Sequence, residues 1–97
     1  MATRKSEGRD KLAVAARLQL TRDALGKRQG EFARAADIKE NTYNQYEKGK
    51  NLMSLEEAHK LCDAHNLTLD WIYRGDQSNL RAALADAIKA IRQARRA

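Results

Sequence analysis

Amide, carboxylate and ammonium side chains recur at a regular interval between Glu40 and Lys48. If Tyr43 and Tyr46 face inward, the outward positions follow the spacing i, i+1, i+4, i+5 and i+8, which is one stripe of an α-helix. The members of this stripe are Glu40, Asn41, Asn44, Gln45 and Lys48. Asparagine and glutamine can bond N6 and N7 of adenine together, and a glutamate can accept from N4 of cytosine. The stripe therefore has the chemistry needed to contact base edges in DNA.

Two lysines, Lys48 and Lys50, stand on either side of Gly49 at the end of the same segment. Their ammonium groups suit the phosphates of a DNA backbone, and such contacts position a protein without identifying the sequence. A polar stripe on one helix is more often only a solvated surface. These side chains alone therefore leave two interpretations open.

Helical segments are expected along most of the chain. It has no proline and only five glycines, and its many Ala, Arg, Leu and Lys residues favour helix. Helices are expected over residues 10–25, 28–36, 40–48, 55–64 and 68–73. Residues that can end a helix in the left-handed conformation follow four of these segments, at Gly26, Gly49, Asn66 and Gly75. The predicted fold is all-α.

The apolar residues of the early helices define the expected core. For the first helix these are Leu12, Ala15, Ala16, Leu18 and Leu25, and for the second they are Phe32, Ala33 and Ala36. The fourth helix is expected to begin with a reciprocal capping box, in which Ser54 and Glu57 each bond the other's backbone N–H.

The composition limits the class of protein. A chain of 97 residues with 42% hydrophobic residues fits one small domain. The single cysteine excludes an internal disulfide and fits a reducing cytosol. No signal peptide is evident at the N-terminus, and no stretch reaches the roughly 20 apolar residues of a membrane span. A cytoplasmic protein with no membrane partner is expected.

The net charge of +6 favours an acidic partner, but it is concentrated at the two ends of the chain. Residues 1–9 carry +2 and residues 78–97 carry +4, whereas residues 10–77 hold 11 basic and 11 acidic groups. A neutral body with basic ends also fits a protein with solvated tails. The charge therefore gives only weak support for nucleic-acid binding.

Residues 28–48 have the pattern of a helix-turn-helix unit, in which two short helices are joined by a tight turn and the second lies in the major groove. From Arg17 to Gly75 the chain also resembles the phage-repressor family of helix-turn-helix proteins (Xre, lambda-repressor-like or Cro-type). The matching segments are RLQLTR (17–22), RQGEFA (28–33), TYNQYEKG (42–49), SLEEAHKLCDA (54–64) and LTLDWIYRG (67–75). They occur in order and at family spacing over about 59 residues. The resemblance implies a five-helix DNA-binding domain.

The same resemblance implies a role for individual residues. The glutamine that begins the second helix, here Gln29, binds a phosphate and supports the recognition helix. The expected base-contacting residues are Glu40, Asn41, Asn44 and Gln45. Phosphate contacts are expected from Gln29, Lys39, Lys48 and Lys50. Arg22 of the first helix is expected to pair with Glu47 for structural reasons.

Four positions depart from the family pattern. Asp37 stands where the turn usually has glycine, although aspartate tolerates the left-handed region better than most residues. Arg28 and Lys39 stand where Ser or Thr usually caps the second and third helices, and losing such a cap costs about 0.5–2 kcal/mol. If both cations face phosphates, Arg28 is also a phosphate-binding residue. The carboxylate of Glu40 repels phosphate, so it must either select cytosine or weaken binding.

Other candidate sites are weaker. His59, Cys62 and His65 spread over about 120° of a helix, which prevents them from binding one zinc ion without a further ligand, so core packing is expected. Trp71 and Tyr73 are expected to close the domain and not to stack on bases. There is no glycine-rich phosphate loop and no arrangement of catalytic side chains. Neither enzyme activity nor a metal or cofactor is expected.

Residues 76–97 are expected to form a C-terminal amphipathic helix with Ser78 as its N-cap. Its apolar positions, within about 140° of one face, are Leu80, Ala83, Leu84, Ala87, Ile88, Ile91 and Ala94. The opposite face carries Arg81, Lys89, Arg92 and Arg96. Because an isolated helix is marginal in water, the apolar stripe needs a partner. Packing on its own domain and a symmetric dimer both satisfy this need, whereas the lack of aromatic residues disfavours a membrane surface.

The predicted organisation is a flexible basic arm (1–9), a helix-turn-helix domain (10–75) and the C-terminal helix (76–97). The predicted function is sequence-specific binding of double-stranded DNA by a transcriptional regulator, a repressor that acts as a homodimer with helix 40–48 in the major groove. The alternative left open is a protein–protein interaction module, or an antitoxin-like protein, that contacts a partner protein with the face that carries Glu40.

Overall fold

The computed structural model describes residues 11–96, and this part of the chain contains six helices. They are α1 (Lys11–Leu25), α2 (Gln29–Ala35), α3 (Glu40–Glu47), α4 (Leu55–His65), the single π-helical turn η2 (Asp70–Arg74) and α5 (Ala82–Arg96). No strand occurs within this range, so the predicted all-α fold is confirmed. The expected N-terminal arm, residues 1–9, lies outside the described residues.

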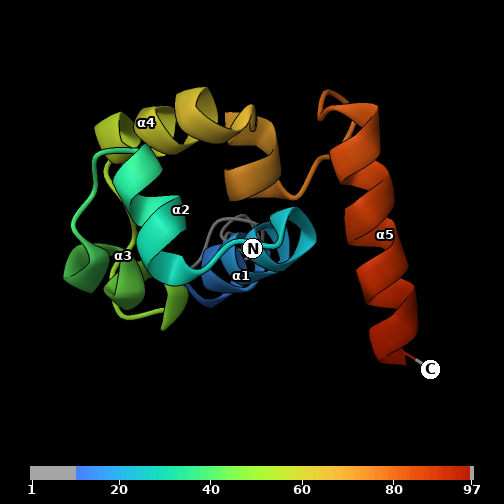
Figure 1. Ribbon diagram of the computed structural model, residues 1–97, viewed down its shortest axis with the longest axis horizontal. Coiled ribbons are helices and arrows are strands. Elements are labelled where there is room, and N and C mark those ends of the chain that lie inside the picture. Colours follow the sequence, from blue (N-terminus) through green and yellow to red (C-terminus); the bar gives the residue numbers. More distant parts are fainter. Residues whose placement is uncertain (1–10, 97) are drawn as a thin grey trace, which may run out of the picture.

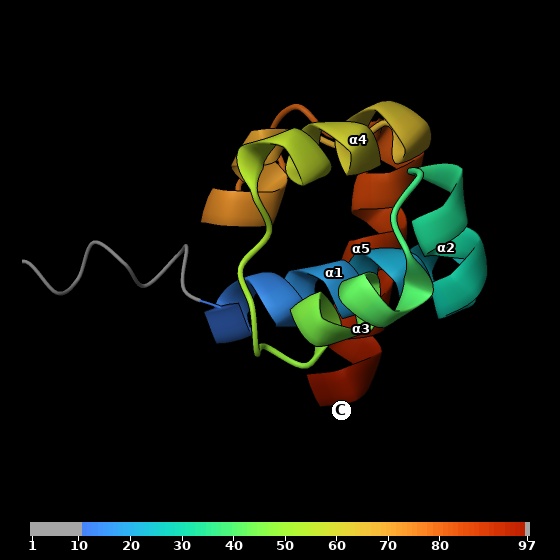
Figure 2. The same ribbon diagram turned by 90° about the vertical axis from the view of Figure 1, so that its left-hand side faces the viewer.

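The helix α1 lies at the centre of the arrangement (Figure 1). It contacts α3, η2 and α5, while α2 contacts α3 and α4. Figures 1 and 2 place α3 and α5 on opposite sides of α1. The outward surface of α3 is therefore not covered by the C-terminal helix.

The buried face of α1 differs from the predicted one. Leu12 is 72% exposed and Ala16 is also exposed, whereas Val14 and Leu20 are buried. Because α1 packs against three other helices at once, its buried surface is wider than the single stripe that was expected. The predicted inward residues of α2 are buried as expected: Phe32, Ala33 and Ala36.

The helix ends follow the predicted terminators. Gly26, Gly49, Asn66 and Gly75 all have positive φ angles. A β-carbon at Gly49 would lie 2.6 Å from Cδ2 of Leu12, but that side chain is exposed and can move, so the φ of 76° is what favours glycine there. The turn residue Asp37 has a φ of 58°, which confirms the left-handed conformation expected of an aspartate at a glycine position.

Only half of the predicted capping box at α4 forms. Oγ of Ser54 accepts a hydrogen bond from the backbone N–H of Glu57 at 3.2 Å. The carboxylate of Glu57 instead accepts from the hydroxyl of Tyr46, at the end of α3. The reciprocal bond was predicted wrongly because the buried tyrosine offers this carboxylate a tertiary partner.

The predicted fifth helix forms as η2, which begins at Asp70 and not at residue 68. Oγ1 of Thr68 accepts from the backbone N–H of Trp71 at 3.0 Å and holds the start of this turn. The Trp71 side chain is fully buried, and its indole Nε1 donates to Oγ1 of Thr21 in α1 at 2.8 Å. Trp71 thus closes the domain, as predicted.

The C-terminal helix begins later than predicted, at Ala82. Ser78 is not its N-cap, because the backbone N and Oγ of Ser78 both donate to Oδ1 of Asp76, at 2.9 and 2.6 Å. The local turn made by these bonds separates the serine from the helix. Leu84 and Ile88 are buried within the same chain.

Two polar contacts also attach α5 to the rest of the molecule. Arg95 pairs with Asp23 of α1, with 2.7 Å between Nη2 and Oδ2. The guanidinium carbon of Arg92 lies 5.4 Å from the centre of the Trp71 ring. Arg92 was expected on the face opposite the apolar stripe, but the face of the indole attracts its cation toward the body of the protein.

Candidate nucleic-acid interface

The two tyrosines of α3 are buried as predicted, and they orient the helix. Tyr43 packs against Phe32 of α2 with 5.4 Å between the ring centres, and Ile38 is buried in the turn between these helices. Because the tyrosine side of α3 faces the core, the polar stripe faces away from it. Tyr46 extends the buried side to the last turn of the helix.

A single carboxylate joins the first three helices. The Glu47 side chain is only 4% exposed, and its Oε2 lies 2.7 Å from Nε of Arg22 in α1. The same carboxylate accepts hydrogen bonds from Nε2 of Gln29 in α2 at 2.9 Å and from the Tyr43 hydroxyl at 2.6 Å. The hydrogen bond from Arg22 to Glu47 raises the pKa of this arginine. The predicted Arg22–Glu47 pair is confirmed, and Gln29 supports α3 as expected, through a partner, Glu47, that was not named in the prediction.

The predicted DNA-contacting residues come from the start of α2, the turn and α3. Six of them are exposed: Arg28, Lys39, Glu40, Asn41, Lys48 and Lys50. Three are half-buried: Gln29, Asn44 and Gln45. Arg28, Gln29 and Glu40 share one surface depression of about 390 Å³. Lys48 and Lys50 follow the opposite end of α3.

The starts of α2 and α3 both lack the usual Ser or Thr cap, and a side-chain contact replaces it at α2 but not at α3. At α2 the backbone N–H of Arg28 donates to Oε1 of Glu31 at 3.0 Å, and this hydrogen bond lowers the pKa of Glu31. A glutamate three residues after the N-cap is a signal that could have predicted this contact. At α3 the side chain of Lys39 makes no capping bond, so this helix begins without a side-chain cap.

The histidine–cysteine segment of α4 is structural in the described region. Nε2 of the buried His65 donates to the carbonyl oxygen of Phe32 at 2.9 Å, and the two rings stack with 3.9 Å between their centres. His59 is exposed. Within residues 11–96 no group of three His, Cys, Asp or Glu side chains is placed to hold a metal ion.

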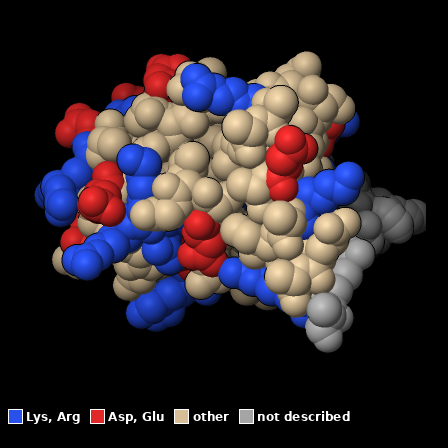
Figure 3. Space-filling view, turned by 45° about the vertical axis from the view of Figure 1, so that its right-hand side comes forward, with Lys and Arg blue, Asp and Glu red and all other residues tan. Residues whose placement is uncertain are grey.

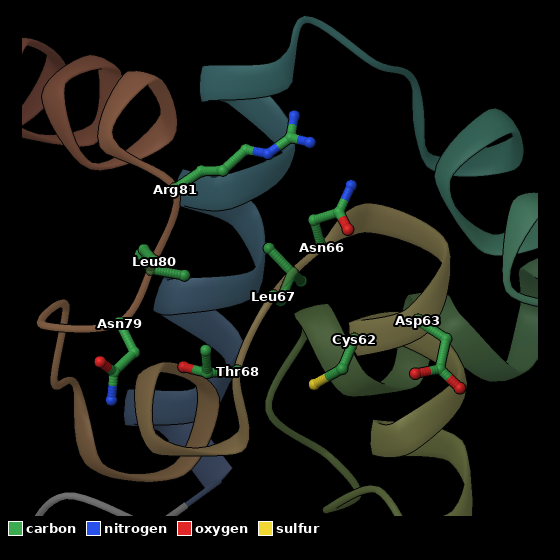
Figure 4. Close-up of a pocket in the computed structure, with 8 residues that line it drawn as sticks. All are labelled: Cys62, Asp63, Asn66, Leu67, Thr68, Asn79, Leu80 and Arg81. Atoms are coloured by element: carbon green, nitrogen blue, oxygen red, sulfur yellow. The ribbon is translucent and has the colours of Figure 1, made fainter.

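A second depression, of about 500 Å³, lies beside Cys62 (Figure 4). It is lined by the end of α4, residues 66–68 and residues 79–81. Burial raises the pKa of the Cys62 thiol to about 11, so this thiol stays protonated at neutral pH. The prediction that Cys62 packs in the core is only partly correct, because the side chain is half-exposed.

On the face of the molecule that is turned toward the viewer in Figure 3, the charge is mixed and not uniformly basic. Figure 3 shows blue and red atoms interspersed, with Lys and Arg gathered toward the left of the view and a tan area at its centre. Exposed acidic residues, among them Glu31, Asp37 and Glu40, lie close in sequence to the cations of the α2–α3 surface. DNA binding at this surface would depend on individual contacts more than on a broad positive field.

Residues 18–72 match the model of the helix-turn-helix family. Because this match covers more than half of the 97 residues, the chain belongs to that family, and its resemblance to Xre or lambda-repressor-like proteins is confirmed. The family comprises DNA-binding regulators, which are generally not enzymes. No curated protein and no solved structure matches the chain significantly. None of the helices formed by residues 11–96 is both long enough and apolar enough to cross a membrane.

Proposed function

We propose that this protein is a transcriptional repressor that binds a specific double-stranded DNA sequence as a homodimer, with α3 in the major groove. The observation that carries this proposal is the orientation of α3. Its tyrosines are buried and Glu47 is bonded to α1 and α2, so the Asn41–Gln45 side of the helix is left to contact a ligand. Membership of a family of DNA-binding regulators supports DNA as that ligand.

In this proposal the residues divide between two roles. Glu40, Asn41, Asn44 and Gln45 contact base edges, where amides favour adenine and the carboxylate favours cytosine. Arg28, Gln29, Lys39, Lys48 and Lys50 contact phosphates and fix the position of the helix. Gln29 can contact a phosphate while it supports α3. A glutamine amide has two N–H donors, and the bond to Glu47 uses one of them.

The dimer follows from the usual geometry of DNA recognition by this class of helix. Two recognition helices related by a two-fold axis contact half-sites about 34 Å apart. A repressor is the simplest regulator of this kind, because occupying an operator needs no additional domain. Whether residues 76–97 contribute to the two-fold contact is part of the test.

Selection of binding sites from random duplex DNA, at about 150 mM salt, tests the proposal. A palindrome with half-sites about one helical turn apart is the expected product. Selection with a full-length variant that carries glutamate in place of Ala83 and Ala94, two exposed positions of α5, then tests the role of this helix, because loss of the palindrome with retention of a half-site would assign dimerisation to it. If the full-length protein selects no motif and shows only salt-sensitive background binding, the proposal fails and a partner protein becomes the better ligand.

A further inference from the structure

A depression of about 380 Å³ lies beside α5, and every side chain that lines it offers N–H donors. The lining residues are Gln77, Lys89, Arg92 and Gln93. Lysine and arginine carry donors and no acceptor, and each glutamine amide adds two donors. Within residues 11–96 no carboxylate lines this depression, whereas the depression at the start of α2 includes Glu31 and Glu40. The lining therefore fits an anion that accepts several hydrogen bonds at once.

The two cations of this depression have no acidic partner in the described part of the chain. The ion pairs found there involve neither Lys89 nor Arg92. The carboxylate of Asp76 is bonded by Ser78, and Asp86, exposed one turn before Lys89, does not line the depression. Both cations are therefore available to an anion from outside the chain.

The side chain of Arg92 is held in place before any ligand binds. Its guanidinium carbon lies 5.4 Å from the centre of the Trp71 ring, where the face of the indole attracts the cation. Trp71 is itself fully buried, and its Nε1 donates to Oγ1 of Thr21. A planar guanidinium matches the geometry of a phosphate group, and a side chain that is already ordered loses less freedom on binding. Arg92 is thus suited to bind a phosphate.

The cations continue along α5 beyond the depression. Arg81 is exposed three turns before Arg92 and on the same side of the helical axis. The two positions are about 16 Å apart along that axis, at 1.5 Å per residue. One small anion would need only the depression, whereas a row of cations of this length fits the regularly spaced charges of a nucleic-acid backbone.

This row lies on the far side of the molecule from the proposed recognition helix. Figures 1 and 2 place α3 and α5 on opposite sides of α1, and the axes of packed helices are about 8–10 Å apart. The major groove proposed to receive α3 is only about 8.5 Å deep, so a duplex bound there does not extend past α1 to α5. Phosphates at α5 must therefore belong to another segment of DNA.

We propose that the Lys89–Arg92 side of α5 binds the phosphate backbone of a second DNA duplex while α3 holds the first. The protein thereby bridges two segments of DNA. The proposal rests on DNA binding by α3 for the first duplex and adds a second surface, which binds without reading the sequence because its contacts are to phosphates.

A bridging assay tests this surface. A duplex with the full selected palindrome is immobilised and loaded with protein, so that both recognition helices of the dimer are occupied. A labelled duplex of about two helical turns that lacks this site is then added at about 50 mM salt. The loaded protein is expected to capture it. If two phosphates are neutralised, the affinity for the labelled duplex should fall roughly tenfold between about 50 and 200 mM salt.

Charge-changing variants locate the contact. Lys89→Glu reverses a charge of the depression, and Gln93→Glu places a carboxylate in it at nearly constant size. Both positions are exposed, so the fold is kept, and each variant is expected to reduce capture roughly tenfold or more. Arg95→Gln is the matched control, because this arginine of α5 already pairs with Asp23 and its loss should leave capture unchanged. All three variants should bind a short duplex that carries only the selected site as tightly as the wild type does.

The outcomes separate this inference from the proposed function. Equal capture by the wild type and Lys89→Glu overturns the inference, because another surface then holds the second duplex. Polyglutamate that displaces the labelled duplex as effectively as unlabelled DNA of equal charge also overturns it, because the surface then responds to negative charge in general. In both cases a selected palindrome leaves the proposed function intact.

Failure of the wild type to select any sequence overturns the proposed function instead. The α5 surface is then tested alone, by comparing the non-specific binding of a duplex to the wild type and to Lys89→Glu. Weaker binding by the variant supports the surface, and equal binding contradicts it.

Discussion

Glu47 is the residue on which the orientation of α3 most depends, because its buried carboxylate accepts from Arg22, Gln29 and Tyr43. Glu47→Ala would leave the largely buried guanidinium of Arg22 without its ion-pair partner. Breaking a buried pair in this way costs on the order of 3–5 kcal/mol. The free energy of unfolding, measured by urea denaturation, checks this expectation. Asp63→Ala, at an exposed position of α4, is the control and should change stability by about 0.5 kcal/mol or less.

Asn41 and Lys48 are expected to differ in how they affect DNA binding. Asn41→Ala removes a proposed base contact, so it should cost roughly 1–3 kcal/mol on the selected site and relax the preference at one position. Lys48→Ala removes a proposed phosphate contact, so it should weaken binding to all sequences and reduce the log–log salt slope by about 1. Gln93→Ala and Lys89→Ala remove an exposed amide and an exposed lysine of α5 and serve as controls. Equal losses on every sequence for Asn41→Ala would refute its assignment.

His65 makes the stability of the fold depend on pH. Burial lowers its pKa from the usual 6.5, with a further contribution from Lys27, while the hydrogen bond to Phe32 acts in the opposite direction. The unfolded chain therefore binds a proton at His65 more readily than the folded chain does. The stability gained by burying the neutral imidazole is fully present above the unfolded pKa. It is lost progressively as the pH falls below 6.5 toward the lower folded value.

The urea midpoint at about pH 7.5 and about pH 5.5 tests this effect. The wild type should lose more stability at the lower pH than His65→Gln, whose amide can still donate to the Phe32 carbonyl but does not titrate. His59 is present in both proteins, so the difference between them isolates His65. Equal losses in the two proteins would assign the pH dependence to other groups.

At the scale of single helices, the uncapped start of α3 links stability to DNA affinity. Lys39→Ser should supply the missing side-chain cap and stabilise the fold by about 0.5–2 kcal/mol, and it should weaken DNA binding by removing the proposed phosphate contact. Lys39→Ala removes the same cation without adding a cap, so it should weaken binding to the same extent with no comparable gain in stability. Thermal denaturation and binding to the selected site measure the two effects. Unchanged DNA affinity in both variants would show that Lys39 does not contact phosphate.

The elements that could be predicted from the sequence are those determined by local signals. Gly26, Gly49 and Asn66 end their helices because they can adopt positive φ angles, and that property belongs to the residue itself. The inward orientation of Tyr43 and Tyr46 could be expected because it places the polar residues of the segment on one stripe of the helix. The Arg22–Glu47 pair was available only through the family resemblance.

The features that could not be predicted depend on contacts between distant segments. The buried face of α1 is set by three other helices at once, so Leu12 is exposed although it lies on an apolar stripe. Glu57 bonds Tyr46, and Arg92 lies over Trp71, because tertiary packing brings these partners within reach.

At the scale of the whole molecule, α5 and the helix-turn-helix body should unfold together. Ile88 is fully buried although it lies near the end of the chain, and α5 contacts the central helix α1. Ile88→Ala should therefore cost about 2–5 kcal/mol, whereas Lys89→Ala, at the exposed neighbouring position, should have little effect. The only tryptophan in the chain, Trp71, lies beside Arg92 of α5, and its fluorescence should follow the same transition as the far-UV circular dichroism. Separate transitions would show that α5 is an independent unit.

The four hydrogen bonds that Arg22, Gln29 and Tyr43 donate to Glu47 also have a thermodynamic consequence for association. Since one carboxylate holds α1, α2 and α3 together before any ligand arrives, the backbone of the recognition unit is already ordered in the free protein. Less conformational entropy is then lost on complex formation than for a helix that folds on its target. The entropy change measured by calorimetry should thus be dominated by released counterions, displaced water and the immobilised side chains of α3, with little contribution from helix folding.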